Sequence, residues 1–133
     1  MIKGLAHVCF HVPDLAAAEA FYCDKLGFRR AFDFTNDKGK RIGVDLYISG
    51  RSFLELFRSE VTPPQPNQSY QHLCLEVEDL PAVVEAMRGM GIEVTDPAKG
   101  SDGSWQAWLA DPYGNRIELH CYTPESKQFP WMK

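Results

Sequence analysis

The chain has 133 residues, with 14 Lys and Arg against 18 Asp and Glu, and a formal net charge of −4. No run approaches the roughly 18 consecutive apolar residues that a membrane helix needs, and the N-terminus lacks the pattern of a signal peptide. An acidic chain without a Lys/Arg cluster argues against a nucleic-acid surface, because cationic side chains supply most of the affinity for phosphates. We expect one cytoplasmic domain that binds small molecules or other proteins rather than nucleic acid or membrane.

The first half of the chain has the pattern of a strand, a helix and three further strands. Asp14 is placed to cap the helix, whose apolar residues recur every three or four positions, and Gly27 follows it where a left-handed conformation is favoured. The expected elements, in chain order, are a strand beginning at His7, a helix from Leu15 to Leu26, strands near residues 28–36 and 42–49, and a last strand over residues 52–57.

The second half repeats this pattern at an offset of 65 residues, from His7 to His72. In both halves the His strand is followed by an aspartate that can cap a helix, Asp14 or Asp79. The expected elements are a strand from His72, a helix closed by Gly91, strands near residues 92–96 and 104–110, and a last strand over residues 115–121. The sequence therefore predicts two βαβββ modules in tandem.

Two segments lie outside the expected modules, which span residues 4–60 and 71–122. The proline-rich stretch 61–70 predicts a linker, because proline disfavours regular strand pairing. The tail 123–133 is aromatic, which argues against a disordered end. Docking on its own module, covering the site and clasping a partner subunit all remain open for it.

The four cysteines are far apart in the sequence, and no two form a Cys-x-x-Cys pair. Zinc-ribbon and thioredoxin-type sites therefore lack their spacing. We expect Cys9, Cys23, Cys74 and Cys121 to be reduced, buried residues.

Alternation along four strands places two histidines and two glutamates on the faces that the helices do not cover. Val8, Phe10 and Val12 point one way in the first strand and His7 points the other, and the same split recurs in the remaining three strands. The residues that share this property are His7, Glu55, His72 and Glu118. Any one of them alone is most simply a hydrogen-bonded or solvated strand residue.

Together, these four matched residues point to a divalent metal. Two imidazoles and two carboxylates among apolar neighbours are costly without a counter-charge, which a cation supplies. Imidazole and carboxylate without thiolate suit Zn, Ni, Co, Mn or Fe(II). Four protein ligands leave an octahedral ion two positions for water or substrate, which is a catalytic arrangement.

Several other residues are candidates for contacts with a substrate. Strand-face positions of this kind can orient ligands, but solvated strand ends explain them equally well. Aromatic residues in strands can line a pocket or simply pack. Lys99 can meet an acidic substrate or stand exposed in a hairpin. The candidates are His11, Phe53, Phe57, Glu76, Lys99, Trp108, Arg116 and His120.

Five segments together resemble the vicinal oxygen chelate superfamily, which contains glyoxalase I, extradiol dioxygenases and resistance proteins. The segments, which span residues 4–122, are the His7 strand, Phe21-Tyr22…Leu26-Gly27-Phe28, Phe53-Leu-Glu55-Leu-Phe57, His72-Leu-Cys-Leu-Glu-Val and Asp111-Pro-Tyr-Gly-Asn-Arg-Ile-Glu118. The resemblance implies an α+β fold in which two βαβββ modules form a curved, cup-like mixed sheet with helices outside. It also implies pairing in a homodimer.

The set His7, Glu55, His72 and Glu118 resembles the ligands of bacterial glyoxalase I. That resemblance implies a lyase or isomerase in which a metal chelated by two adjacent substrate oxygens stabilises the enediolate left by proton removal. Glu118 is our choice of base and Glu55 the alternative. Where glyoxalase I holds glutathione, this chain has His11, Ser59 and Gln68, which do not reproduce an arginine's bidentate hold.

Two other functions remain open from the sequence. An Fe(II) dioxygenase of the extradiol type ordinarily has three protein ligands, so Glu55 counts against it. A metal-independent drug-binding or resistance protein has no reason to keep all four ligands. The glyoxalase-like lyase or isomerase is therefore preferred over both functions.

Overall fold

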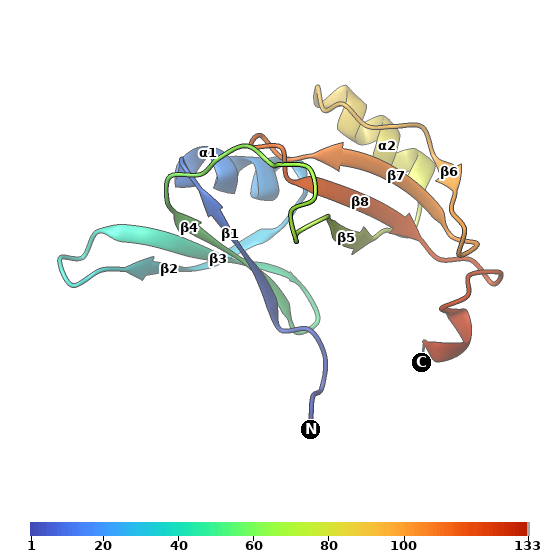
Figure 1. Ribbon diagram of the computed structural model, residues 1–133, viewed down its shortest axis with the longest axis horizontal. Coiled ribbons are helices and arrows are strands. Elements are labelled where there is room, and N and C mark those ends of the chain that lie inside the picture. Colours follow the sequence, from blue (N-terminus) through green and yellow to red (C-terminus); the bar gives the residue numbers. More distant parts are fainter. Residues whose placement is uncertain (133) are drawn as a thin grey trace. The chain divides into compact units, whose positions relative to one another are not determined.

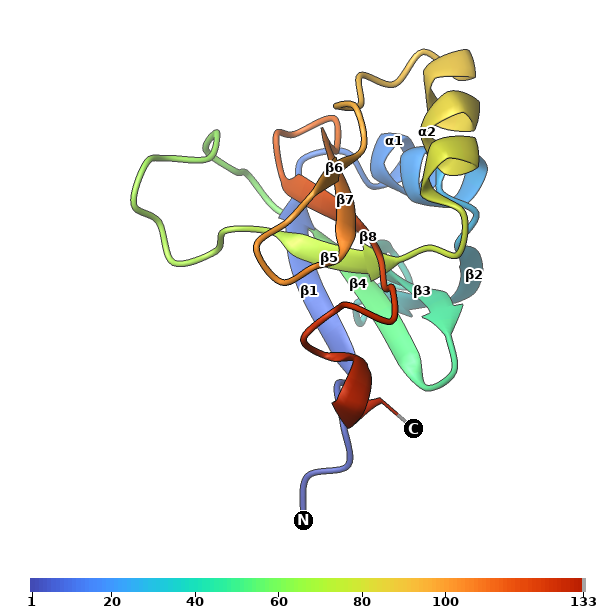
Figure 2. The same cartoon turned by 90° about the vertical axis from the view of Figure 1, so that its right-hand side faces the viewer.

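The computed structural model describes residues 1–132, and Lys133, the end of the expected tail, lies outside them. The chain divides into two compact units, the first from Met1 to Pro63 and the second from Pro64 onward. The boundary falls in the proline-rich stretch, which carries neither helix nor strand (Figure 2). Among the described residues, no helix is long and apolar enough to cross a membrane.

The first unit is a four-stranded mixed sheet with a helix on one face (Figure 1). Its strands lie in the order β1-β4-β3-β2, with β1 parallel to β4 and the other neighbours antiparallel. Its elements are β1 (His7–Val12), α1 (Leu15–Ala20), the π-helical turn η1 (Phe21–Lys25), β2 (Arg29–Thr35), β3 (Arg41–Ser49) and β4 (Ser52–Arg58).

The helix of the first unit begins and ends where its sequence predicts. The Asp14 carboxylate accepts a hydrogen bond from the Ala17 amide at 3.0 Å, and Gly27 takes a φ of +80° after the last turn. Between them, α1 widens into η1. The wider turn accommodates two consecutive buried aromatics, Phe21 and Tyr22, and the Tyr22 ring stacks on Phe28 at 5.8 Å.

The second unit repeats this topology, with strands in the order β5-β8-β7-β6 and β5 parallel to β8. Asp79 caps its helix through the Ala82 amide, and Gly91 has a φ of +80°. Its elements are β5 (Leu73–Glu76), α2 (Leu80–Gly89), β6 (Ala98–Lys99), β7 (Trp105–Ala110), β8 (Arg116–Cys121) and the 3-10 turn η2 (Phe129–Trp131). The predicted α+β class and the repeat of the βαβ unit are confirmed.

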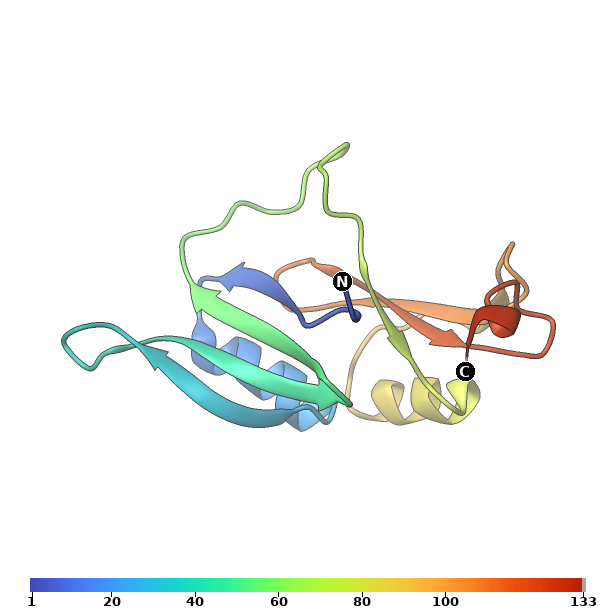
Figure 3. The same ribbon diagram turned by 90° about the horizontal axis from the view of Figure 1, so that it is seen from below.

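Each core lies between a helix and one face of its own sheet (Figure 3). In the first unit Leu54 and Leu56 of β4 are fully buried, and in the second Ile117 and Leu119 of β8 are at most 1% exposed. Because side chains alternate along a strand, burying these residues directs the intervening Glu55 and Glu118 to the opposite faces. The burial of these leucine and isoleucine side chains therefore places both glutamates on the face that the helix does not cover.

The predicted strand over residues 92–96 is wrong. Thr95 runs beside β7, donating its amide to the Trp108 carbonyl at 3.0 Å, but the Trp108 amide bonds the Thr95 hydroxyl at 2.8 Å instead of a carbonyl. A side chain thus replaces one rung of the backbone ladder, and Pro97 has no amide hydrogen to extend it. Regular pairing starts only at the two-residue strand β6.

The prediction that the cysteines are buried is also wrong. All four are free thiols; Cys9 and Cys74 are exposed, and Cys23 and Cys121 are half-buried. Cys9 and Cys74 lie at equivalent positions of the repeat, next to Glu55 and Glu118 in the strand registers. They share the face of the glutamates, which the helices leave uncovered.

The described part of the tail docks on its own unit. The hydroxyls of Ser126 and Ser104, both buried, are 2.7 Å apart, and the Lys127 amide donates to the Asp102 carbonyl at 2.8 Å. These bonds attach the tail to the β6–β7 loop. Its aromatic end is exposed, with 86% of Trp131 accessible.

Candidate metal centre

The first unit brings one histidine and one glutamate together on its helix-free face. His7 begins β1, and Glu55 lies in the middle of the neighbouring parallel strand β4. His7 Nε2 is 3.5 Å from Glu55 Oε1. The imidazole is half exposed, whereas the carboxylate is 18% exposed. The pair is therefore a nitrogen and an oxygen donor open to solvent from one side.

The second unit contains the matching pair. His72 directly precedes β5, and its Nε2 is 3.2 Å from Oε2 of Glu118 in β8. The Gln71 side chain contacts His72 Nδ1, and the other ring nitrogen, Nε2, faces Glu118. The edge of Trp108 packs against His72, with ring centroids 4.8 Å apart.

These donor pairs fit a divalent ion. Two donors that bind one ion at about 2.1 Å and at a right angle lie about 3 Å apart. The pairs in the two units, at 3.5 and 3.2 Å, are close to this spacing. In both pairs an imidazole nitrogen faces a carboxylate oxygen, and a cation bound to the two atoms would stabilise this arrangement. Imidazole nitrogen and carboxylate oxygen suit the first-row divalent metals.

A third acidic residue, Asp45, joins the first pair and was not predicted. It lies on β3 directly opposite Glu55, is 6% exposed, and its Oδ1 has no hydrogen-bond partner among the described residues. Burial raises the pKa of the Asp45 carboxyl, the Glu55 charge raises it further, and His7 opposes the shift. The signal was present in the apolar run Val44-Asp45-Leu46, where alternation places Asp45 on the Glu55 face.

Glu118 has a second histidine on its other oxygen. His120, two residues along β8 and 6% exposed, has Nδ1 3.3 Å from Glu118 Oε1. Cys74, Glu118 and His120 form a group whose donor atoms all lie within 4.8 Å of one another. Partial desolvation and the Glu118 contact raise the pKa of the Cys74 thiol to about 12, however. His72, in contrast, occupies the position in the repeat that His7 has beside Glu55, so the repeat favours His72 as the partner of Glu118.

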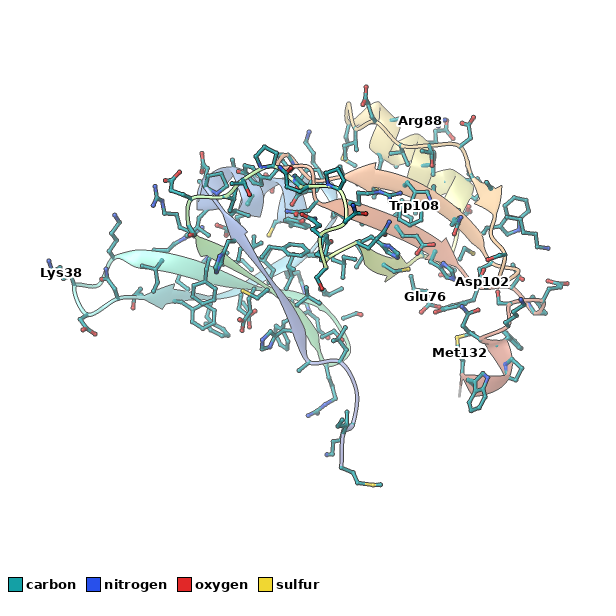
Figure 4. All side chains as sticks on the ribbon, in the orientation of Figure 1. Lys38, Glu76, Arg88, Asp102, Trp108 and Met132 are labelled. Atoms are coloured by element: carbon teal, nitrogen blue, oxygen red, sulfur yellow. The ribbon has the colours of Figure 1, made fainter. Side chains whose placement is uncertain are left out.

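Trp108 and Arg116 lie beside the second pair. Trp108 pairs with Glu118 across the β7–β8 ladder, and the Arg116 guanidinium lies over its ring, 4.4 Å from the centroid. The tryptophan therefore has His72 at its edge and a cation on its face. Glu76 is exposed at the end of β5 (Figure 4).

The predicted aromatic residues of the first unit share the face of His7 and Glu55. Phe53 pairs with His7 and Phe57 with exposed His11 across the β1–β4 ladder. The Phe57 ring lies 4.8 Å from Phe34. Two aromatic rows thus flank the row that carries Glu55.

Lys99 is not brought to the Glu118 face. Its Nζ lies 5.9 Å from the ring centroid of Trp105, with which it pairs between β6 and β7. Trp105 lines a pocket of about 700 Å³ with Leu80 and Pro81 at the start of α2. Lys99 therefore belongs to the helix side of the second unit.

Comparison with known proteins gives one family for almost the whole chain. The sequence model of the glyoxalase/bleomycin resistance protein/dioxygenase superfamily matches residues 4–119. The chain is similar to a lactoylglutathione lyase of Haemophilus influenzae, at 31% identity over 122 residues, which cover 86% of this chain and 90% of that protein. It is also similar to the metallothiol transferase FosB of Bacillus licheniformis, at 27% identity over 90% of this chain and 75% of that protein.

The fold is shared with solved structures. The crystal structure of a glyoxalase family protein from Enterococcus faecalis superposes with a TM-score of 0.76 at 28% identity. The superposition covers 89% of this chain and 97% of that one.

Proposed function

Because the chain belongs to the glyoxalase/bleomycin resistance protein/dioxygenase superfamily, we propose that it is a divalent-metal-dependent lyase or isomerase of the glyoxalase type. The observation that carries the proposal is the repetition of one histidine–glutamate pair in each unit, at 3.5 and 3.2 Å. A four-donor site requires one such pair from each module, on the face that the helix does not cover, and both modules meet that requirement. A drug-binding protein without a metal would not need either.

In this proposal His7, Glu55, His72 and Glu118 hold one ion of Ni, Zn, Co, Mn or Fe. When bound, such an ion acts as a Lewis acid on two adjacent oxygens of a substrate. The substrate is an α-hydroxycarbonyl or hemithioacetal, whose C–H bond next to the carbonyl becomes acidic. Phe53 and Phe57, which share the face of Glu55, would line one side of the bound molecule.

Glu118 is the proposed base. It removes the proton from one carbon and returns it to the next, so no net oxidation takes place. His120 Nδ1 lies 3.3 Å from Glu118 Oε1 and orients the carboxylate for the transfer, while Oε2 faces His72 Nε2 at 3.2 Å. Glu55, with His7 as its histidine, is the alternative base.

The proposal predicts bound metal and a proton shift, and both can be measured on the same preparation. Elemental mass spectrometry should find about one divalent ion per chain, and His7→Ala/Glu118→Ala should lose it. The metal-loaded protein is then incubated in D₂O with an α-hydroxyketone or with the glutathione hemithioacetal of methylglyoxal. We expect isomerised product, detected by NMR and absent after chelation, with deuterium in the fraction whose proton exchanges with solvent while Glu118 holds it.

Two results would contradict this assignment. A protein that neither carries nor takes up a divalent ion has no metal-dependent reaction. Bound metal without isomerisation of either probe would remove the lyase or isomerase class, and oxygen consumption with a catechol would then indicate a dioxygenase.

The family resemblance also motivates the proposal of a cytoplasmic homodimer that acts on small molecules. We expect light scattering to give about twice the mass of one chain. A mass of one chain at working concentration would remove the dimer from the proposal.

A further inference from the structure

A line of polar contacts runs from the proposed base to the tail. Glu118 Oε1 contacts His120 Nδ1 at 3.3 Å, and His120 Nε2 lies 3.4 Å from Asp102 Oδ2. Asp102 is in the loop between β6 and β7, near the end of β8 from which the tail leaves (Figure 4). None of these contacts is needed to hold a metal, since His72 already accompanies Glu118.

His120 is the buried link in this line. Its side chain is 7% exposed, and its ring packs against Tyr122 with centroids 4.7 Å apart. Nε2 is buried and has no hydrogen-bond partner in residues 1–132. An unpartnered buried ring nitrogen costs free energy, so the carboxylate 3.4 Å away is its natural partner. The two groups together fix the direction of the ring.

Asp102 is itself held on both carboxylate oxygens. The Ser104 amide donates to Oδ1 at 3.0 Å, and the Gln128 side-chain amide donates to Oδ2 at 2.7 Å. These two hydrogen bonds, the Ser104 amide first, lower the pKa of the Asp102 carboxyl, and His120 adds to the shift. Asp102 is therefore an ionised, oriented acceptor at neutral pH.

The tail fixes the loop that carries Asp102. Thr123 Oγ1 donates to the Gly103 carbonyl at 3.0 Å, alongside the Ser104–Ser126 contact. Gly103 has a φ of +86°, and a Cβ there would stand 2.5 Å from the Glu125 carbonyl oxygen. Only glycine allows the tail backbone to lie this close to the loop.

We propose that His120 and Asp102 are positioning residues that orient Glu118 toward the metal, and that the tail from Thr123 to Gln128 holds Asp102 in place for this purpose. The inference rests on the proposed function, because it concerns the carboxylate assigned there as ligand and base. It adds a role for the tail, which the four-ligand site does not require. Partners of this type orient a ligand without touching the ion.

The test is the affinity of the full chain for Ni²⁺ or Co²⁺, measured by competition with a chromophoric chelator. Asp102→Asn should weaken binding by about 10- to 100-fold. It should also change the visible absorption of the Co²⁺-loaded protein, while the melting temperature of the metal-free protein stays close to that of the parent. Gln128→Ala should weaken binding in the same direction and by less. Asp37→Asn, in the exposed turn between β2 and β3, is the matched control and should leave affinity unchanged.

A double-mutant cycle separates positioning from a general structural effect. In His120→Asn the amide nitrogen takes roughly the place of Nδ1, so the contact with Glu118 is kept and the link to Asp102 is lost. Adding Asp102→Asn to this background should change affinity by no more than about twofold. Additive losses, or an unchanged affinity in Asp102→Asn, would overturn the positioning role.

Three further outcomes separate this inference from the proposed function. Loss of metal in Cys74→Ser with retention in His72→Ala would place the ion in the Cys74, Glu118 and His120 group, making His120 a ligand and overturning its positioning role. A parent protein that binds no divalent ion overturns the proposed function and this inference with it. If the Asp102 and His120 variants change metal affinity as expected but the protein isomerises neither probe, only the proposed reaction is overturned.

Discussion

Replacing Glu118 by glutamine is expected to lower turnover by about 10²- to 10⁴-fold while the fold is kept. The amide has the size of the carboxylate and retains an oxygen that can bind metal, but it cannot accept the substrate proton. The change is at a side chain already 10% exposed and directed away from the core. Initial rates with the hemithioacetal, together with the far-ultraviolet circular dichroism spectrum, would check this expectation.

The control for this substitution is Glu85→Gln, which removes an exposed carboxylate from α2. It should leave the rate unchanged. Glu55→Gln provides the comparison within the site, because Glu55 is the alternative base. If Glu55→Gln abolishes turnover and Glu118→Gln retains the parent rate, the proton transfer belongs to the first unit's carboxylate.

Replacing Leu119 by alanine is expected to lower the free energy of unfolding by about 2–5 kcal/mol. Leu119 is 1% exposed and pairs with Leu75 and Ala107 on the helix-facing side of β8. The substitution leaves a cavity in the core under β8, at the residue between Glu118 and His120. Urea unfolding followed by circular dichroism would measure the loss.

Leu5→Ala is the matched control, since Leu5 is 66% exposed and precedes β1. It should change the free energy of unfolding by less than about 0.5 kcal/mol. A loss of less than 1 kcal/mol in Leu119→Ala, as small as ordinary surface changes, would mean that β8 is not part of a close-packed core.

The repeat made most of the fold predictable. Strand and helix positions followed from two local signals, alternation along the strands and the aspartates and glycines at the helix ends. Both signals act within a few residues, so they do not depend on tertiary context. The same alternation assigned His7 and Glu118 to the helix-free faces, as the strand registers show.

The missed features depend on contacts between segments far apart in the sequence. The strand expected at residues 92–96 failed because Thr95 bonds β7 partly through its hydroxyl. Alternation along Val44-Asp45-Leu46 indicates the face of Asp45, but its place beside Glu55 depends on the register between β3 and β4. The contact of Asp102 with His120 needs the β6–β7 loop and the tail to come together, and neither has a pattern that predicts the other.

The internal repeat places one histidine and one glutamate in each module. Histidine and glutamate stand on neighbouring parallel strands of one unit, β1 with β4 and β5 with β8. If these residues are the ligands proposed above, duplication of one module would copy a complete two-donor half-site in a single event. An exchange of whole modules between two copies of the chain likewise leaves each histidine with its own glutamate.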